Sequence, residues 1–147
     1  MVRSIFNTAD DFTLTVLRLK LGVVFFAHGA QKMLGWFGGE GFSATMNSFT
    51  QGGIPVPLAF LAISAEFFGG LGLLVGLLGR IAALGILTNM VVATFMVHIH
   101  VGFFMNWYGK QTGEGFEYHL LAIALALAIL IKGSGALSID RWFTTRR

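Results

Sequence analysis

The sequence predicts an all-α fold, a bundle of four transmembrane helices, and three observations support this prediction. The chain of 147 residues is 55% hydrophobic and only 12% charged, with a mean hydropathy of +0.75. Soluble globular proteins carry about 25% charged residues, so this chain lacks the polar surface that water requires. Glycine is also frequent, with 20 glycines against 2 prolines, and glycine is commoner in membrane helices than in soluble ones.

The four apolar segments run over residues 13–34, 58–78, 81–100 and 118–136. A helix needs about 20 residues to cross the hydrocarbon core of a bilayer. The fourth segment reaches that length only if it continues past Lys132 to Ala136, with the lysine side chain extending to the interface. A chain of 147 residues has the length of one domain, so we expect one transmembrane domain over residues 1–147.

The basic residues predict the orientation of the bundle. Cytoplasmic loops of membrane proteins carry an excess of Lys and Arg. If the N-terminus is cytoplasmic, eight basic residues lie on the inner side and only Lys32 and Lys110 on the outer side. The eight are Arg3, Arg18, Lys20, Arg80, Lys132, Arg141, Arg146 and Arg147. We therefore expect both termini to be cytoplasmic, in a multi-pass protein of the cell (inner) membrane. We interpret Arg18 and Lys20 as anchors at the inner membrane interface and Arg80 as an anchor at a helix end.

The connections between the segments differ in length. A tight turn at Gly79-Arg80 is expected to join the second and third helices. The first outer loop, residues 35–57, is glycine-rich and carries Phe42, Met46 and Phe49 at helical spacing. This spacing predicts a short amphipathic helix lying in the membrane interface. The sequence pI near 9.7 does not point to nucleic acid, because the basic residues form no patch studded with aromatic residues.

A stripe of small residues follows the second segment at spacings of three and four. The stripe consists of Ala62, Ala65, Gly69, Gly72, Gly76 and Gly79. Lipid offers no hydrophobic drive between helices, so close backbone approach at small residues holds such helices together. We expect this helix to lie at the centre of the bundle.

Polar and ionisable residues inside the apolar segments predict the functional site, because such residues are costly to place in a bilayer. The first segment carries His28, Gln31 and Lys32, with His28 and Lys32 on one face. His28 lies about 9 Å and Glu66, on the second segment, about 12 Å from the outer ends of their helices. Ionisable residues at such depth mark functional sites by default. Glu66 and His28 are therefore the candidate catalytic residues, and Lys32 and Gln31 are candidates for binding a ligand.

Further candidates for ligand binding close the outer end of the bundle. His98 and His100 point about 200° apart on a helix, so at most one faces the interior. His100 shares a face with Asn89 and is the one expected to face inward. Glu117 and His119 open the fourth segment at the same level.

Two other interpretations of these polar residues remain open. Glu66 and Lys32 would form a purely structural ion pair in one of them, with the histidines as ordinary interface residues. The other is a haem or zinc site, but the spacing of the four histidines matches no ligand motif, and no metal site is predicted.

The chain resembles the DoxX family of small bacterial and archaeal membrane proteins. The residues that carry the resemblance are His28-Gly29-x-Gln31-Lys32, Gly38-Gly39-x-Gly41, Ala65-Glu66-x-x-Gly69-Gly70, Gly79-Arg80-x-Ala82-Ala83, Gly102-Phe103-Phe104 and Glu117-Tyr118. The resemblance implies a redox role, because a few members are subunits of membrane thiosulfate:quinone oxidoreductases. Another member takes part in a membrane-associated complex that handles thiol and oxidative stress.

The favoured hypothesis is therefore a membrane component of a quinone-linked redox system, a subunit rather than an enzyme established on its own. The sequence names no cofactor, and a quinone is expected as a bound substrate. The expected partners are the lipid bilayer, a membrane-associated or soluble oxidoreductase, and further copies of the chain in a homo-oligomer. The alternatives are a small proton-coupled transporter or exporter, with Glu66 as its coupling carboxylate, and a non-catalytic membrane anchor for a partner oxidoreductase.

Overall fold

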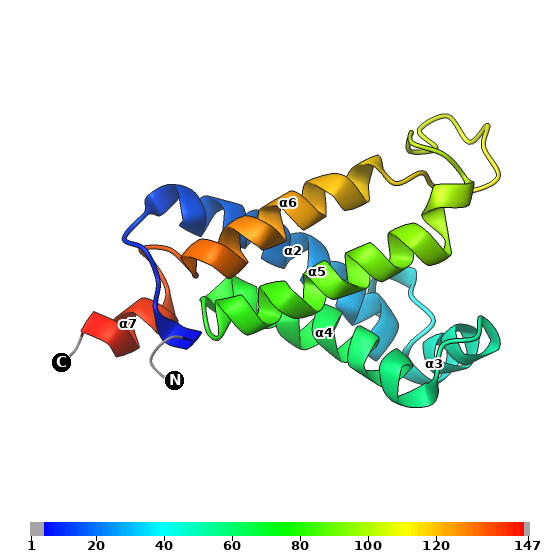
Figure 1. The fold of residues 1–147 in the computed structure, drawn as a ribbon. Coiled ribbons are helices and arrows are strands. Elements are labelled where there is room, and N and C mark those ends of the chain that lie inside the picture. The colour runs from blue at the N-terminus through cyan, green and yellow to red at the C-terminus, as the bar shows by residue number, and fades with distance from the viewer. Residues whose placement is uncertain (1–4, 146–147) are drawn as a thin grey trace.

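The structure is a computed structural model that describes residues 5–145, and no strand occurs within this range. Four helices form the bundle: α2 (Phe12–Leu34), α4 (Val56–Val75), α5 (Gly79–Met96) and α6 (Glu117–Lys132). Figure 1 shows them running side by side, with α3 (Phe42–Gln51) and the 101–116 loop at one end and α7 (Ile139–Thr145) at the other. Two 3₁₀ turns, η1 (Trp36–Gly38) and η2 (His98–His100), follow α2 and α5. The predicted all-α class is confirmed.

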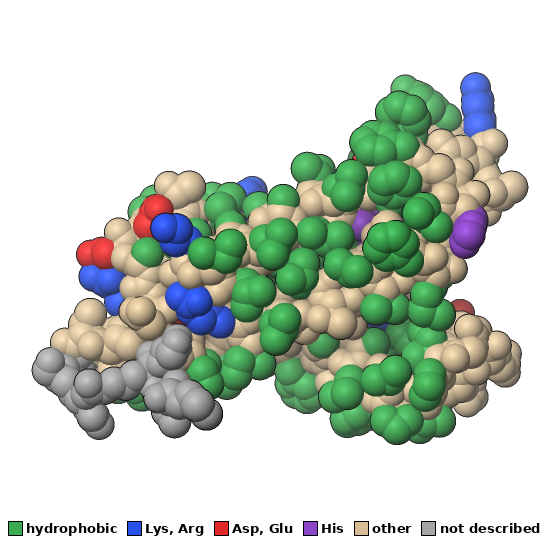
Figure 2. Space-filling model, in the orientation of Figure 1, with side chains coloured by type: hydrophobic (Ala, Val, Ile, Leu, Met, Phe, Trp, Pro, Cys, Tyr) green, Lys and Arg blue, Asp and Glu red, His purple; other side chains and the backbone are tan. Residues whose placement is uncertain are grey.

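Within residues 5–145, three helices, α2, α4 and α5, are long and apolar enough to cross a membrane. Large apolar side chains cover the outside of the bundle, among them Val23, Leu61, Phe68, Leu84 and Leu121. Figure 2 shows this apolar cover over the middle of one face, with most charged groups near the ends. Water would oppose so large an exposed apolar surface, whereas lipid tails match it.

The fourth helix is shorter than predicted. α6 ends at Lys132, and Gly133 and Gly135 then turn the chain with positive φ values of 91° and 85°. The expected extension to Ala136 is therefore wrong. The 16 residues of α6 span about 24 Å at 1.5 Å per residue, less than the roughly 30 Å of a bilayer core.

Glycines set the spacing between α2 and α4. A Cβ on Gly29 would lie 2.4 Å from the backbone of Phe67, and one on Gly70 would lie 2.4 Å from the backbone nitrogen of Phe26. Both distances are shorter than a van der Waals contact, so only glycine permits this approach. The predicted small-residue stripe serves a different interface, because Ala65 meets Gly85, and Gly69 meets Ala82, on α5. α4 therefore packs against α2 on one side and α5 on the other.

The end of the bundle that carries α7 is closed by a buried polar network. Arg18 is only 2% exposed and donates to the carbonyl oxygens of Leu73, Leu74, Ser134 and Leu137. The interpretation of Arg18 as an interfacial anchor is wrong, because the segment after α6 folds back over it. Asp140, 1% exposed, accepts from the N–H groups of Leu78 and Gly79 and from the Ser134 hydroxyl.

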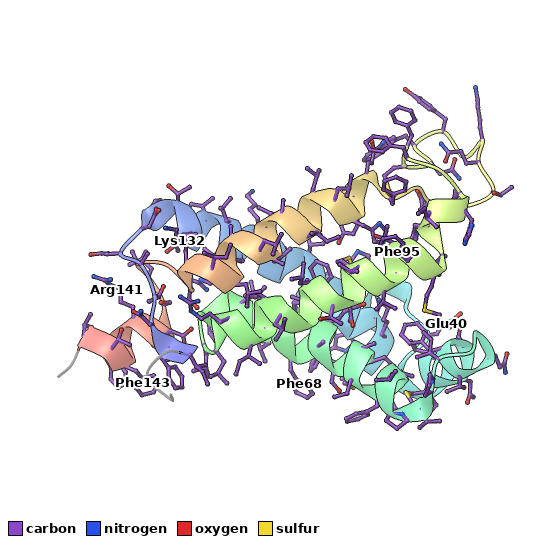
Figure 3. All side chains as sticks on the ribbon, in the orientation of Figure 1. Glu40, Phe68, Phe95, Lys132, Arg141 and Phe143 are labelled. Carbon is purple, nitrogen blue, oxygen red and sulfur yellow. The ribbon has the colours of Figure 1, made fainter. Side chains whose placement is uncertain are left out.

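The turn between α4 and α5 lies earlier than expected. Gly76 and Leu78 adopt left-handed conformations, and α5 already begins at Gly79. Arg80, in the first turn of α5, donates to the carbonyl oxygens of Asn7 and Leu130. Lys132 and Arg141 lie at the same end of the molecule, opposite Glu40 (Figure 3). Arg3, Arg146 and Arg147, which the orientation prediction also used, lie outside the described residues.

Candidate functional site

An ion pair between α2 and α4 forms the centre of the candidate site. The ammonium group of Lys32, in the last turn of α2, donates to a carboxylate oxygen of Glu66, in the middle of α4. The side chain of Glu66 is 7% exposed and that of Lys32 is 28% exposed. The sequence predicted similar depths for His28 and Glu66, so that Glu66 could contact His28 or Lys32, and the structure brings Lys32 and Glu66 together. The side chain of Lys32 therefore connects a buried carboxylate with the surface of the molecule.

His28 lies one helical turn before Lys32 and faces α6. Its ring lies 6.4 Å from the ring of Tyr118, measured between centroids. Both Lys32 and Glu66 are close enough to act on the imidazole electrostatically, and the side chain of Gln31 lies near it. The first predicted group, His28, Gln31, Lys32 and Glu66, is therefore assembled at one end of the bundle.

Tyr118 is a member of this site that the sequence argument did not select. Its hydroxyl oxygen is buried and has no hydrogen-bond partner in the part of the chain that the structure describes. The phenol also lies within electrostatic range of Glu66. A buried hydroxyl without a partner costs about 1–3 kcal/mol, so this group has the capacity to bind a ligand or water. The sequence feature that points to Tyr118 is its position between Glu117 and His119 at the start of α6.

The glycine-rich loop after α2 wraps around the end of that helix. The carbonyl oxygen of Gln31 accepts from the N–H groups of Gly35 and Gly41, each at 3.2 Å. A Cβ on Gly39 would lie 2.3 Å from the same oxygen, so glycine is required at this contact. The Gln31 side chain donates to the carbonyl of Phe37 at 3.3 Å. This loop thus holds Gln31 and Lys32 in place beside two recesses.

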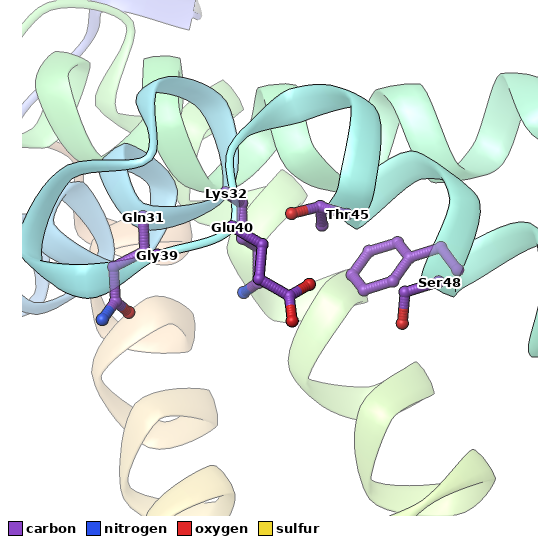
Figure 4. A pocket seen from close by; sticks show the side chains of 7 residues that line it. Gln31, Lys32, Gly39, Glu40, Thr45 and Ser48 are labelled. Carbon is purple, nitrogen blue, oxygen red and sulfur yellow. The ribbon is translucent and has the colours of Figure 1, made fainter.

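The two recesses share Gln31 as a wall. One has a volume of about 370 Å³ and a largely apolar lining, made up of Val23, Val24, Ala27, His28, Gln31 and Phe37. The other has a volume of about 260 Å³ and a more polar lining, made up of Gln31, Lys32, Gly39, Glu40, Thr45, Ser48 and Phe49. Figure 4 shows the second recess between the end of α2 with its loop and the helix α3. Lys32 and His28 therefore each face a separate open space.

The histidines beyond α5 do not lie as predicted. His100 is exposed, whereas His98 is half-buried and packs on His119 with ring centroids 4.0 Å apart. The prediction that His100 faces the interior is therefore wrong. The helix ends at Met96, and Val97 with φ −124° and ψ −58° changes the direction of the chain, so the helical projection from Asn89 does not extend to His100. Asn89 itself faces inward and donates to the Ala62 carbonyl at 2.8 Å.

His119 and Glu117 serve the base of the 101–116 loop. His119 is 6% exposed, and its Nδ1 atom has no partner among residues 5–145. His98 contacts the carbonyl oxygen of Glu114 through Nδ1 at 2.8 Å. Glu117 accepts from the N–H of Met105 at 2.9 Å and from the indole of Trp107 at 3.2 Å. These residues hold the loop onto α6. No group of three or more His, Cys, Asp or Glu side chains in the described range is arranged to hold a metal ion.

The chain is similar to known proteins along most of its length. "Putative oxidoreductase CatD" of Bacillus subtilis (strain 168) is 27% identical over 134 residues, which cover 91% of this chain and 89% of that protein. "Inner membrane protein YqjF" of Escherichia coli (strain K12) is 29% identical over 132 residues, 90% of this chain and 92% of that protein. No solved structure gives a significant match. The sequence profile of the DoxX family matches residues 13–99, a range that includes the Lys32–Glu66 pair and more than half of the chain. The chain therefore belongs to the DoxX family.

Proposed function

We propose that this protein is a multi-pass component of a quinone-linked redox system in the cell (inner) membrane. It passes electrons or protons between a donor on the outer side and the quinone pool, together with a partner oxidoreductase. Its relatives support the proposal, since one is named as a putative oxidoreductase and another as an inner membrane protein. The family membership supports the same role.

The proposed topology has four spans in one transmembrane domain, with both termini in the cytoplasm. Arg80 and Arg141 contact Asn7 and Asp10 at one end of the bundle, and an excess of Lys and Arg favours the cytoplasmic side. α6 is short for a transmembrane span. It crosses the membrane because the bilayer becomes thinner around the bundle, and this thinning costs only a modest free energy per ångström. α3 lies in the outer interface, with Phe42 packed on Phe60 of α4 at a centroid distance of 6.2 Å.

The observation that carries the functional proposal is the buried Lys32–Glu66 pair with His28 beside it and an open recess on each side. A quinone that accepts electrons also takes up protons, and carboxylate and imidazole groups supply them. Glu66 and His28 are assigned this role. Gln31, which lines both recesses, is assigned to a hydrogen bond with a quinone carbonyl, and Lys32 is assigned to ligand binding in the polar recess.

The apolar recess is the proposed place for the quinone ring. Its lining by Val23, Val24 and Ala27 matches a lipid-soluble ligand, and His28 and Gln31 supply the few polar groups that fix its orientation. Phe37, which is 69% exposed, lies at the edge of this recess and offers an aromatic face for stacking. Tyr118 does not line this recess, and its ring lies 6.4 Å from the ring of His28 between centroids.

Quinone binding to the purified protein in lipid nanodiscs tests this function. Ubiquinone and menaquinone are titrated while tryptophan fluorescence is recorded, and saturable quenching is expected. Glu66→Gln and His28→Gln weaken the binding. Glu114→Gln, a carboxylate on the exposed loop that binds the Asn106 N–H, leaves it unchanged. Absence of saturable binding for both quinones contradicts the proposal. If redox activity instead follows a co-purified subunit and survives both changes, the chain is a membrane anchor.

A further inference from the structure

Lys32 connects the buried carboxylate of Glu66 with the polar recess. Its ammonium group is paired with Glu66, and the same side chain lines the 260 Å³ recess together with Glu40, Thr45 and Ser48. Its exposure of 28% against 7% for Glu66 shows that solutes reach the lysine and not the carboxylate. An anion that enters this recess therefore meets the partner of Glu66 first.

Few charged groups near Glu66 are able to replace Lys32 as its counter-ion. From α2, Lys32 and His28 face it, and from α6, Tyr118 lies within electrostatic range. Glu117 and His119 flank Tyr118 in the first turn of α6, at the base of the 101–116 loop. α5 carries Arg80 as its one charged residue, at the opposite end of the bundle. No second cation pairs with Glu66 within residues 5–145.

A buried carboxylate that loses its counter-ion takes up a proton, because an unpaired charge in a medium of low polarity is too costly. We propose that the polar recess binds a small anion on Lys32 and that this binding drives proton uptake by Glu66. The inference rests on the proposed role of Glu66 as a proton-handling group and adds the anion that controls it. The anion takes the place of the carboxylate on Lys32, and the proton neutralises the carboxylate. The net charge of the site is unchanged for a monovalent anion.

The lining of the recess supports a small ligand. Ser48 and Gln31 line the same recess as Lys32. The Ser48 hydroxyl and the Gln31 amide are hydrogen-bond donors for an oxyanion or carboxylate. Thr45 is already committed, since it donates to the Gly41 carbonyl at 2.8 Å. Glu40 carries the opposite sign on the rim and disfavours anions of high charge. The site therefore selects compact anions of low charge.

Proton uptake on anion binding tests the proposal. The protein, in nanodiscs of phosphatidylcholine at neutral pH, is titrated with acetate or formate at an ionic strength fixed with a bulky anion, gluconate. Calorimetry in two buffers of different ionisation enthalpy then gives the protons taken up. The expected result is about one proton per anion bound. Glu66→Gln binds the anion without proton uptake, and Lys32→Gln neither binds nor takes up protons.

Two further variants place the anion in this recess. Glu40→Gln removes a repulsive charge from the rim and is expected to tighten binding by up to about fivefold. Lys110→Gln, on the exposed outer loop, is the matched control and leaves both quantities unchanged. A short-chain, water-soluble phosphatidylglycerol is titrated in parallel. If it alone causes proton uptake, the natural anion is a lipid headgroup rather than a free solute.

Three results overturn the proposal: no binding of any of these anions, binding without proton uptake by the unchanged protein, or unchanged proton uptake in Glu66→Gln. The quinone titration remains a separate measurement. Loss of quinone binding with intact anion-linked proton uptake contradicts the redox function alone. Normal quinone binding without anion-linked uptake contradicts this inference alone.

Discussion

Arg18 donates a hydrogen bond from Nη1 to the carbonyl oxygen of Leu74 at 2.8 Å, and this bond joins α2 to the last turn of α4. The same guanidinium reaches Ser134 at 2.8 Å and Leu137 at 2.7 Å in the segment after α6. One buried side chain thus ties three parts of the chain together. The carbonyl groups at the end of a helix have no partner within the helix, and Arg18 supplies one.

Replacement of Arg18 by methionine is therefore expected to destabilise the protein. The apolar side chain fills the volume but leaves several buried carbonyl groups without donors, each worth about 1–3 kcal/mol, so a loss of at least about 3 kcal/mol is expected. Unfolding in sodium dodecyl sulfate, followed by circular dichroism, measures it. Lys20→Met, two residues away and exposed, is the control and changes stability by less than about 0.5 kcal/mol. Equal stability of the two variants contradicts the role given to Arg18.

The position of Arg18 shows what the sequence leaves undetermined. The apolar segments of the chain predicted the helices, and the positions of His28 and Glu66 within their helices predicted that these two residues lie at similar depth. Both features are local, because they depend on helix geometry within one segment. The burial of Arg18 depends on contacts with Ser134 and Leu137, more than a hundred residues later. No pattern in α2 reports that contact.

The histidines give a second example. His100 was placed inward by extending a helix for four residues beyond its actual end at Met96. Helix ends are the least certain part of a prediction from sequence, and an error there changes which side chain faces the interior. Tyrosine at a helix end is typical of a membrane interface, so the sequence does not distinguish Tyr118 as a site residue. Its buried hydroxyl becomes evident only when α2 and α6 are packed together.

Two neighbouring glycines on α4 are expected to respond oppositely to alanine. Gly70→Ala places a Cβ 2.4 Å from the backbone nitrogen of Phe26, and α2 and α4 must then separate, at a cost of about 3 kcal/mol. A Cβ on Gly69 lies 3.5 Å from the Ala82 carbonyl, an ordinary contact. Gly69→Ala is therefore neutral or stabilising by up to about 1 kcal/mol, the helix propensity of alanine over glycine.

The same unfolding assay compares the two glycine variants in one detergent. The quantity of interest is the difference between the two unfolding free energies, because both variants replace glycine by alanine in the same helix. If Gly69→Ala is the more damaging variant, the close approach of α2 to Gly70 is not the contact that sets the helix spacing.

Asp140 is expected to be the most important carboxylate for stability at the α7 end of the bundle. It accepts from Leu78 N–H at 2.8 Å, Gly79 N–H at 3.0 Å and the Ser134 hydroxyl at 2.6 Å. Asp140→Asn turns an amide donor towards these donors and is expected to cost about 1–3 kcal/mol. Asp10→Asn removes the ion pair with Arg141, where Asp10 is 67% exposed, and costs less than about 1 kcal/mol. Thermal unfolding in detergent distinguishes them, and a larger effect at Asp10 is the contrary outcome.

The last prediction concerns the base of the 101–116 loop. His98 packs on His119 and contacts the Glu114 carbonyl at 2.8 Å, so it connects the end of α5 with the start of α6. His98→Ala removes both contacts, and the amides of residues 101–116 are expected to exchange with deuterium faster, because local opening of the loop costs less free energy. Mass spectrometry of hydrogen exchange in nanodiscs measures this, with His100→Ala as the matched control. His100 is exposed, and its removal leaves the exchange of the loop unchanged. Acceleration in the His100 variant, or in both variants alike, contradicts the assignment of His98 as the residue that holds the loop.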